Sequence, residues 1–172
     1  MAQLKTQHLH MESWTADLAN AALHDESRLE ELFGVHVPDD FPNQPVRDFV
    51  LPNKITELKA EPSRGMWSGI IIHVADNIVI GSMGFKAPPD DGGMVEIGYD
   101  IIPAYQGQGY ATEMAKALIT WGLEQPSVRL ITAECLPNNW ASIRVLQKVG
   151  MQQIDSSTDM LRWELLKMGT NQ

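Results

Sequence analysis

The stretch "IIPAYQGQGYATEMAKALITWGL", Ile101 to Leu123, joins a strand end to a helix through a short glycine turn. It opens on two isoleucines, and two glycines then flank Gln108 just before the helical pattern. Apolar residues recur there at intervals of three and four, which is typical of a helix packed on a sheet. They are Met114, Ala115, Leu118 and Ile119. The spacing predicts a helix from Ala111 onward, with its N-terminus facing a cavity.

The start of this helix is a candidate anion site. Helix N-termini leave four backbone N–H groups unpaired and carry about half a positive charge. Gly107 and Gly109 remove side chains that would keep a ligand from these amides, and they allow the backbone of a cupped turn. Because the chain has a formal net charge of −9, a site for an anion must be made locally positive.

Three kinds of anion-binding turn compete for this stretch. A P-loop needs Lys and then Ser or Thr after its last glycine, and Tyr110 and Ala111 occupy those places. A dinucleotide turn needs a small residue where Thr112 stands, although Glu134 mimics its ribose-binding acid. The third interpretation takes Gln106, Gly109 and Ala111 as the pattern Gln-x-x-Gly-x-Ala.

The rest of the chain predicts an α+β fold in one domain, residues 1–172. Three β-rich runs, "MWSGIIIHVA", "IVIGSMGFK" and "MVEIGYDII", are joined by short turn signals and predict an antiparallel meander. After the glycine turn and its helix follow a strand "VRLITAECL", a helix "NWASIRVLQKVG" and a strand pair within "MQQIDSSTDMLRWELL". This order adds a parallel crossover pair to the meander.

The N-terminal third is less regular. Residues 4–14 alternate with period two and predict a strand, and residues 16–34 predict one helix or two short ones ending at Gly34. Prolines interrupt residues 35–63, although "PNKITELKAEP" fits one helix. We expect this proline-rich region to wall a substrate cleft.

Composition excludes several functions. With 13 Lys and Arg against 22 Asp and Glu, the chain lacks the basic face of a nucleic-acid-binding protein. No apolar run is long enough to span a membrane and no signal peptide is recognisable, so we expect a cytoplasmic protein. One cysteine and five scattered histidines predict neither a disulfide nor a metal site.

Taken together, "VEIGYDIIPAYQGQGYATEMAKAL", the following strand and "LPNNWASIRVLQKVGM" resemble the GNAT acyltransferase superfamily, in the branch of ribosomal-protein N-terminal acetyltransferases. The resemblance covers about residues 66–165 and departs from the family at Met151, where an aromatic residue is usual. It implies a mixed, mainly antiparallel sheet flanked by helices, with two parallel strands splayed apart at an acyl-coenzyme A site.

The resemblance also implies a binding mode for acetyl-coenzyme A. Its pyrophosphate would lie on the N–H groups of Gly107 to Ala111, and its pantetheine arm along the strand that ends at Ile102, pairing with backbone groups of Asp100 to Ile102. The binding residues implied are Ile101, Ile102, Gln106, Gly107, Gln108, Gly109, Tyr110, Ala111, Thr112, Asn139 and Ser142.

The implied reaction is direct attack of a primary amine on the thioester. Glu96 matches a family position for a carboxylate that deprotonates the amine, with Glu134 as its rival, and Ser142 of the pattern Asn-x-x-Ser could donate to the leaving thiolate. The acceptor is a protein N-terminus or a small amine. The alternatives are a non-catalytic acyl-coenzyme A sensor and the dinucleotide-binding protein, and an edge strand such as "MLRWELL" could form a homodimer.

Most other distinctive side chains fit structural roles. Cys135 and His73 read as buried packing residues, and Arg144 and Lys148 as helix charges that could instead meet the 3′-phosphate of coenzyme A. The aromatic residues that fit core or edge packing are Trp67, Phe85, Tyr99, Trp121 and Trp163.

Overall fold

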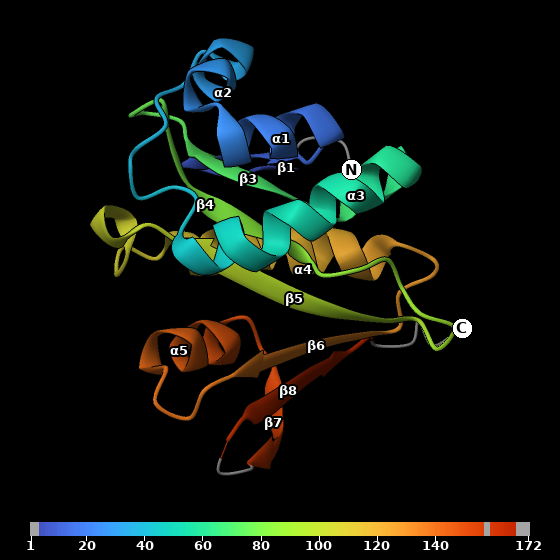
Figure 1. Cartoon of the computed structure of the whole chain (residues 1–172). Helices are drawn as coiled ribbons and strands as arrows, with labels where there is room; N and C mark the ends of the chain where they lie inside the picture. Colours follow the sequence, from blue (N-terminus) through green and yellow to red (C-terminus); the bar gives the residue numbers. More distant parts are fainter. Residues whose placement is uncertain (1–3, 157–158, 168–172) are drawn as a thin grey trace.

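A computed structural model describes residues 4–156 and 159–167. It contains one eight-stranded sheet with helices on both faces (Figure 1). The strands are β1 (Leu4–Lys5), β2 (Leu9–Ser13), β3 (Ser68–His73), β4 (Ile78–Phe85), β5 (Met94–Ile101), β6 (Leu130–Cys135), β7 (Gln152–Ser156) and β8 (Leu161–Leu166). The α-helices are α1 (Ala16–His24), α2 (Glu26–Phe33), α3 (Leu51–Ala60), α4 (Tyr110–Glu124) and α5 (Trp140–Lys148).

The sheet confirms the predicted fold class. Its order is β1-β2-β3-β4-β5-β6-β8-β7, and only β5 and β6 pair in parallel among the described strands. The helix between them, α4, is the one expected after the glycine turn. A dinucleotide-binding fold would repeat this parallel unit, whereas the described strands contain it once.

Two predictions about strands were wrong in detail. The strand expected over residues 4–14 is a hairpin, because β1 and β2 pair antiparallel around a turn in which Thr6 N–H donates to Leu9 O. The segment "MLRWELL" is not an edge, because β8 lies between β6 and β7. The outer strand on that side is β7, which carries the exposed Ile154.

Helix boundaries follow their capping residues. Thr15 accepts from Leu18 N–H at the start of α1, and Gly34 ends α2 in the left-handed conformation. In the proline-rich region, a π-helical turn at Val46–Val50 runs directly into α3. Pro52 is accommodated there because the first turn of a helix needs no N–H donor.

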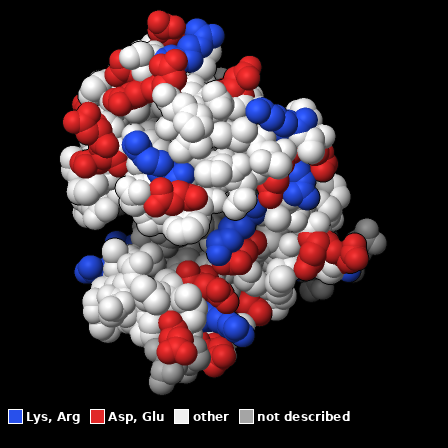
Figure 2. Space-filling model, in the orientation of Figure 1, with Lys and Arg blue, Asp and Glu red and all other residues white. Residues whose placement is uncertain are grey.

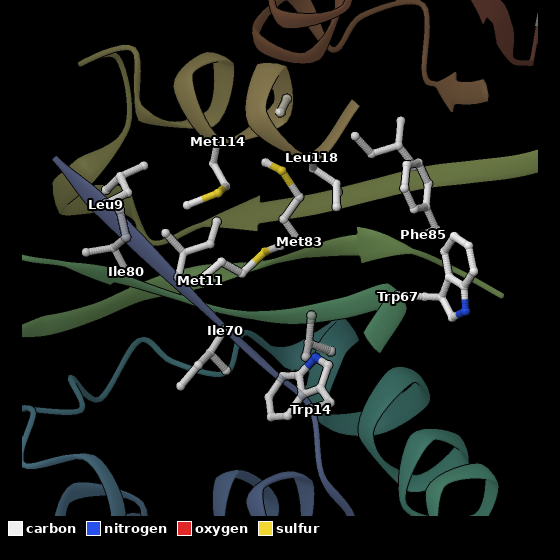
Figure 3. Close-up of a cluster of buried hydrophobic side chains, with 14 of the residues drawn as sticks. Leu9, Met11, Trp14, Trp67, Ile70, Ile80, Met83, Phe85, Met114 and Leu118 are labelled. Carbon is white, nitrogen blue, oxygen red and sulfur yellow. The ribbon is translucent and has the colours of Figure 1, made fainter. Parts of the chain in front are cut away.

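The core lies on both faces of the central strands. Figure 3 shows Met114 and Leu118 of α4 pointing toward Met83, with Trp14 and Ile70 on the other side of the strands. α3 covers the second face (Figure 1). Trp67, Phe85 and Trp121 form an aromatic cluster, with ring centroids 5.2–6.4 Å apart, as the prediction of packing roles for these residues requires.

The parallel pair separates halfway along its length. β5 and β6 are paired from Met94–Leu130 to Glu96–Thr132, and their pairing stops there although both strands continue. Figure 1 shows β5 and β6 diverging beyond this point, on the side where α5 lies. Past Glu96 and Thr132 the facing edges of β5 and β6 therefore no longer pair with each other.

Within the described residues, no helix combines the length and the apolar character needed to cross a bilayer.

Candidate active site

The glycine turn has the geometry of an anion cradle. Gly107 and Gly109 adopt φ angles of 74° and 91°, which favour glycine. A Cβ on either residue would meet no atom within 4 Å, so the turn is open on the outside. The N–H groups from Gly107 to Thr112 find no acceptor among the described residues, and they sit at the N-terminus of the 15-residue helix α4.

Side-chain amides hold this turn in place. Gln106 Nε2 donates to Ile101 O at 2.7 Å, and Gln108 Nε2 donates to Ala104 O at 3.1 Å. Gln106 therefore ties the turn to the end of β5 and does not itself point an amide at the anion. The motif residue acts on the backbone that surrounds the site.

The backbone groups of β5 that turn away from β4 are those of Tyr99 and Ile101, and of these Ile101 O already accepts from Gln106 Nε2. Alternate residues of an antiparallel strand bond to the same neighbour, and Lys86 N–H donates to Glu96 O while Ile102 N–H donates to Ile80 O. Asp100 and Ile102 thus face β4. Of the three residues expected to pair with the pantetheine arm, Asp100 and Ile102 direct their backbone groups at β4, and Ile101 directs its groups away from it.

A cavity of about 490 Å³ runs from the glycine turn to α5. Figure 2 shows a hollow on the left side of the molecule, beside the part that carries α5, with basic side chains at its rim. Arg144 and Lys148 line the cavity and make it locally positive. Predicted residues on its walls are Ile101, Gln106, Gly107, Gly109, Tyr110, Ala111, Thr112, Asn139 and Ser142. Ile102 and Gln108 are not among its lining residues.

The structure shows the structural role that the sequence predicts for Asn139 and Ser142 at this helix start. Asn139 Oδ1 caps α5 by accepting from Ser142 N–H at 3.1 Å. The Ser142 hydroxyl remains available, and Ser142 lines both the large cavity and a smaller one of about 290 Å³ between β5, β6 and α5.

Tyr99 bridges the splay and was read from the sequence as packing only. Its hydroxyl donates to Ser142 O at 3.5 Å, and burial raises the pKa of this phenol despite that bond. Tyr99 lines both of these cavities and a further one that residues of α3 also line. In the sequence Tyr99 lies five residues before Ala104, the first alanine of the turn. A strand pattern alone does not distinguish such a residue from a core residue.

A second cavity, of about 470 Å³, lies between α3 and the opposite face of β4 and β5. The π-helical turn and α3 wall it, as expected for the proline-rich region, with Val46, Phe49 and Lys54 among its lining residues. It shares Asn43, Tyr99 and Asp100 with the first cavity. The two cavities therefore meet at β5.

Asp100 stands at this junction. One carboxylate oxygen accepts from Ser82 Oγ, whereas Oδ2 is buried without a partner among the described residues. Burial raises the pKa of Asp100, and the hydrogen bonds of Ser82 oppose this only in part. A raised carboxyl pKa in a cavity is characteristic of acid–base residues.

The two predicted carboxylates lie elsewhere. Glu96 forms an ion pair with Lys86 and lines none of the three cavities, although it shares a strand face with Asp100. Glu134 lines the small cavity and pairs with Arg162 at 3.2 Å. Cys135 is buried, as predicted.

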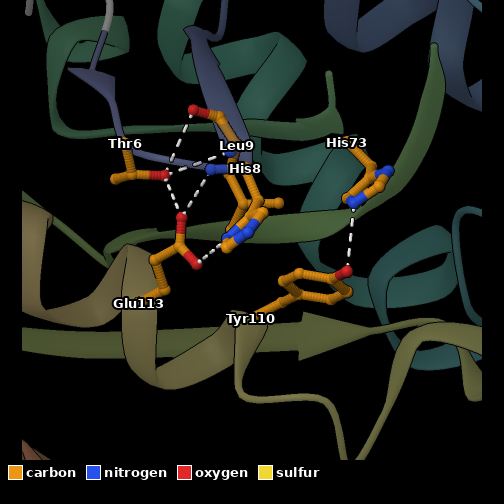
Figure 4. Close-up of polar contacts among 6 residues, drawn as sticks. All are labelled: Thr6, His8, Leu9, His73, Tyr110 and Glu113. Atoms are coloured by element: carbon orange, nitrogen blue, oxygen red, sulfur yellow. Dashed lines mark hydrogen bonds and ion pairs between the residues drawn. The ribbon is translucent and has the colours of Figure 1, made fainter. Parts of the chain in front are cut away.

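A polar network surrounds the start of α4 (Figure 4). Glu113 accepts from Thr6 Oγ1 and from His8 N–H, and its second oxygen lies 2.8 Å from His8 Nδ1. On the other side His73 Nε2 lies 3.0 Å from Tyr110 Oη. These contacts fix the first turn of α4 against the turn between β1 and β2 and against β3. Since the partners are 37 to 107 residues apart, no local pattern reveals them.

No group of three His, Cys, Asp or Glu side chains that could hold a metal ion occurs in the described part of the chain.

Similarity to known proteins agrees with this geometry. The family model "Acetyltransferase (GNAT) domain" matches residues 8–152. "Uncharacterized N-acetyltransferase YjdG" of Bacillus subtilis is 28% identical over 163 residues, covering 95% of this chain and 97% of that protein.

Solved structures share the fold. A ribosomal-protein-S5-alanine acetyltransferase from Vibrio fischeri superposes with a TM-score of 0.69 at 12% identity, covering 97% of each chain. RimL, a ribosomal L7/L12 alpha-N-protein acetyltransferase solved with coenzyme A, gives 0.65 at 16% identity, covering 95% of this chain and 97% of its own. With its glycine turn, its splayed strands and a family match over most of its length, this chain belongs to the GNAT acetyltransferase family.

Proposed function

We propose that the protein transfers the acetyl group of acetyl-coenzyme A to a primary amine. The observation that carries this proposal is the meeting of two cavities at Tyr99 and Asp100. One has unpaired N–H donors and basic side chains suited to an anionic nucleotide. The other, hereafter the acceptor cavity, reaches the same point from the opposite face of the sheet.

Acetyl-coenzyme A fits the residues of the first cavity. The N–H groups from Gly107 to Thr112 suit its pyrophosphate, because a helix N-terminus binds such anions through backbone donors. The edge of β5 at Tyr99 and Ile101 suits the amide-rich pantetheine arm. Arg144 and Lys148 suit the remaining phosphate.

The reaction needs one base and one partner for the thiolate. A carboxylate takes a proton from the acceptor ammonium, and the neutral amine attacks the thioester carbonyl. The C–N bond forms and the C–S bond breaks. The departing sulfur takes the proton of the Ser142 hydroxyl, its proposed donor, and leaves as the coenzyme A thiol. The second proton lost by the amide nitrogen returns to the Ser142 oxygen, so the hydroxyl is restored.

Two carboxylates on β5 are candidates for the base. Glu96 is the base that the sequence predicts. Asp100 is the second candidate, because it lies between the two cavities and its pKa is raised. Glu96→Gln and Asp100→Asn should be compared with Asp39→Asn, an exposed carboxylate outside the cavities. Loss of the base should lower kcat by a factor of about 10² to 10⁴. A carboxylate whose variant keeps the unaltered rate is excluded as the base.

Release of free thiol from acetyl-coenzyme A, measured across a panel of amines and N-terminal peptides, tests the proposal. Binding of acetyl-coenzyme A without thiol release for any acceptor would instead favour a non-catalytic sensor. Stabilisation by NAD but not by coenzyme A would favour the dinucleotide alternative.

A cytoplasmic location and self-association remain predictions. Because β7 is the outer strand, with Ile154 exposed, we expect any pairing of two copies along this side of the sheet to use β7. Light scattering of Ile154→Lys beside the unaltered protein would detect it.

A further inference from the structure

The floor of the acceptor cavity carries two polar atoms that lack partners. Asp100 Oδ2 and Ser68 Oγ are both buried and make no hydrogen bond within the described residues. Both residues line this cavity. Buried polar groups are rarely left unsatisfied because each one costs free energy. β4 separates Ser68 on β3 from Asp100 on β5, so one ammonium group, with three N–H donors and a positive charge, suits the Asp100 carboxylate, and the Ser68 hydroxyl needs a separate partner.

The roof of the same cavity carries a buried cation. Lys54 on α3 is only 7% exposed and lines the cavity. Its Nζ lies 3.8 Å from Glu57 Oε2 and makes no hydrogen bond among the described residues. Burial lowers the pKa of this amine, with Glu57 opposing the shift and Arg64 adding to it.

The other charged residues do not satisfy Lys54. The Glu57 side chain is 40% exposed, so water competes for its carboxylate. Lys86 also lines the cavity, but it is paired with Glu96. A buried ammonium with donors to spare is a site for an anion, and a carboxylate is the anion that occurs most simply on a molecule with a primary amine.

We infer that the acceptor is a free amino acid, held by its ammonium group on Asp100 and by its carboxylate on Lys54. This inference rests on the proposed function and names the class of its acceptor. The apolar walls formed by Trp14, Val46 and Phe49 would receive the side chain.

A protein N-terminus fits this charge pattern less well. Its first residue has an ammonium group, but its carbonyl is part of a peptide bond and brings no charge to Lys54. Burying a lysine without a partner charge is costly, so a neutral amide at this place would leave that cost in the complex. A cavity of about 470 Å³ is also within the range of small-molecule sites.

The test uses pairs of acceptors that differ only in the carboxylate. With acetyl-coenzyme A saturating, thiol release is measured for L-leucine against isoamylamine and L-leucinamide, for L-phenylalanine against phenethylamine, and for L-serine against ethanolamine. Short peptides with the same first residues complete the panel. Calorimetric titration of the same compounds into the protein with coenzyme A provides a readout that is independent of turnover.

The variants are Lys54→Met, which keeps length and packing but removes the charge, and Lys59→Met, an exposed lysine on the same helix. We expect at least one amino acid to exceed its decarboxylated partner in kcat/KM by about 10- to 100-fold, the range for a hydrogen bond to a charged group. Lys54→Met should abolish this preference, mainly through KM, while Lys59→Met retains it.

The outcomes separate the two claims. Equal use of amino acids and their decarboxylated partners, or use of peptides alone, would overturn the amino-acid inference and leave acetyl transfer intact. No thiol release with any acceptor would overturn the proposed function. In that case the cavity has no acceptor; amino-acid binding that Lys54→Met abolishes would then support only an amino-acid site at Lys54, and absence of such binding would overturn that site as well.

Discussion

The substitution Asp100→Asn should stabilise the folded protein at neutral pH while it slows acetyl transfer. Asn can still accept from Ser82 Oγ through its amide oxygen, so the packing and one hydrogen bond are kept. What it removes is a negative charge whose second oxygen is buried without a partner in the described structure. Folding and turnover should therefore change in opposite directions.

The size and pH dependence follow from this burial. A buried unsatisfied group costs about 1–3 kcal/mol, and more when it is charged. Asn leaves a neutral, still unpaired NH₂ group at the place of Oδ2 and removes only the cost of the charge, so it should gain on the order of 1 kcal/mol. For a chain of this length that is about 2–4 °C in Tm. The pKa of Asp100 is raised above its ordinary 3.8. The contribution of this carboxyl to the stability of the folded protein is therefore fully present below pH 3.8 and is lost as pH rises through the raised pKa. The gain should thus be large at pH 8 and small at pH 4.

Urea unfolding of both proteins between pH 4 and pH 8 measures the stability difference, and thiol release measures the rate. If Asp100 is the base, the rate of the unaltered protein should rise with pH through the raised pKa, and Asp100→Asn should lose that rise. A stability difference that is constant across the pH range would refute the claim that the Asp100 carboxylate is buried and unpaired. Lower stability of Asp100→Asn than of the unaltered protein at pH 8 would refute it as well.

Three further predictions concern the turn, the thiolate and the start of α4. Gly109→Ala places a side chain at φ 91°, which should cost about 1–2 kcal/mol and weaken coenzyme A binding in calorimetry; an unchanged Kd would count against the cradle. Ser142→Ala keeps the N–H that Asn139 caps, so kcat should fall at least about tenfold with little change in melting temperature, and an unchanged kcat would remove Ser142 from the reaction. Partial burial would raise the pKa of Glu113, but hydrogen bonds from Thr6 and His8 outweigh it and lower the pKa, so Glu113→Gln should cost about 1 kcal/mol at pH 7. That loss should shrink as pH falls through the lowered pKa, and a loss that persists in acid would contradict the network.

Local periodicity was enough to predict the helices and strands around the glycine turn. The buried face of α4 consists of the four predicted residues plus Gly122, which is small because a Cβ there would lie 2.7 Å from Phe85. The parallel pair and its separation followed from element order and from the family resemblance. These features depend on residues that are close together in the sequence.

Features set by tertiary register were missed or displaced. Whether Tyr99 or Asp100 presents its backbone to the cofactor depends on how β5 pairs with β4, and a one-residue change reverses every assignment. The acceptor cavity brings Lys54 and Ser68 to Asp100 from separate elements. Its unpaired atoms become visible only when all neighbouring donors and acceptors are placed.

The central claim is acetyl transfer from acetyl-coenzyme A to an amine without an acetylated enzyme. Mass spectrometry of a reaction with acetyl-coenzyme A and the amine panel, quantifying N-acetyl product, free coenzyme A and the intact protein mass, tests it most directly. We predict product and thiol in equal amounts, no increase in the protein mass, and slower formation of both products in a Gly109→Ala, Ser142→Ala double variant. Bound acetyl-coenzyme A that stays intact with every amine, or an acetylated protein that precedes the product, would contradict the claim.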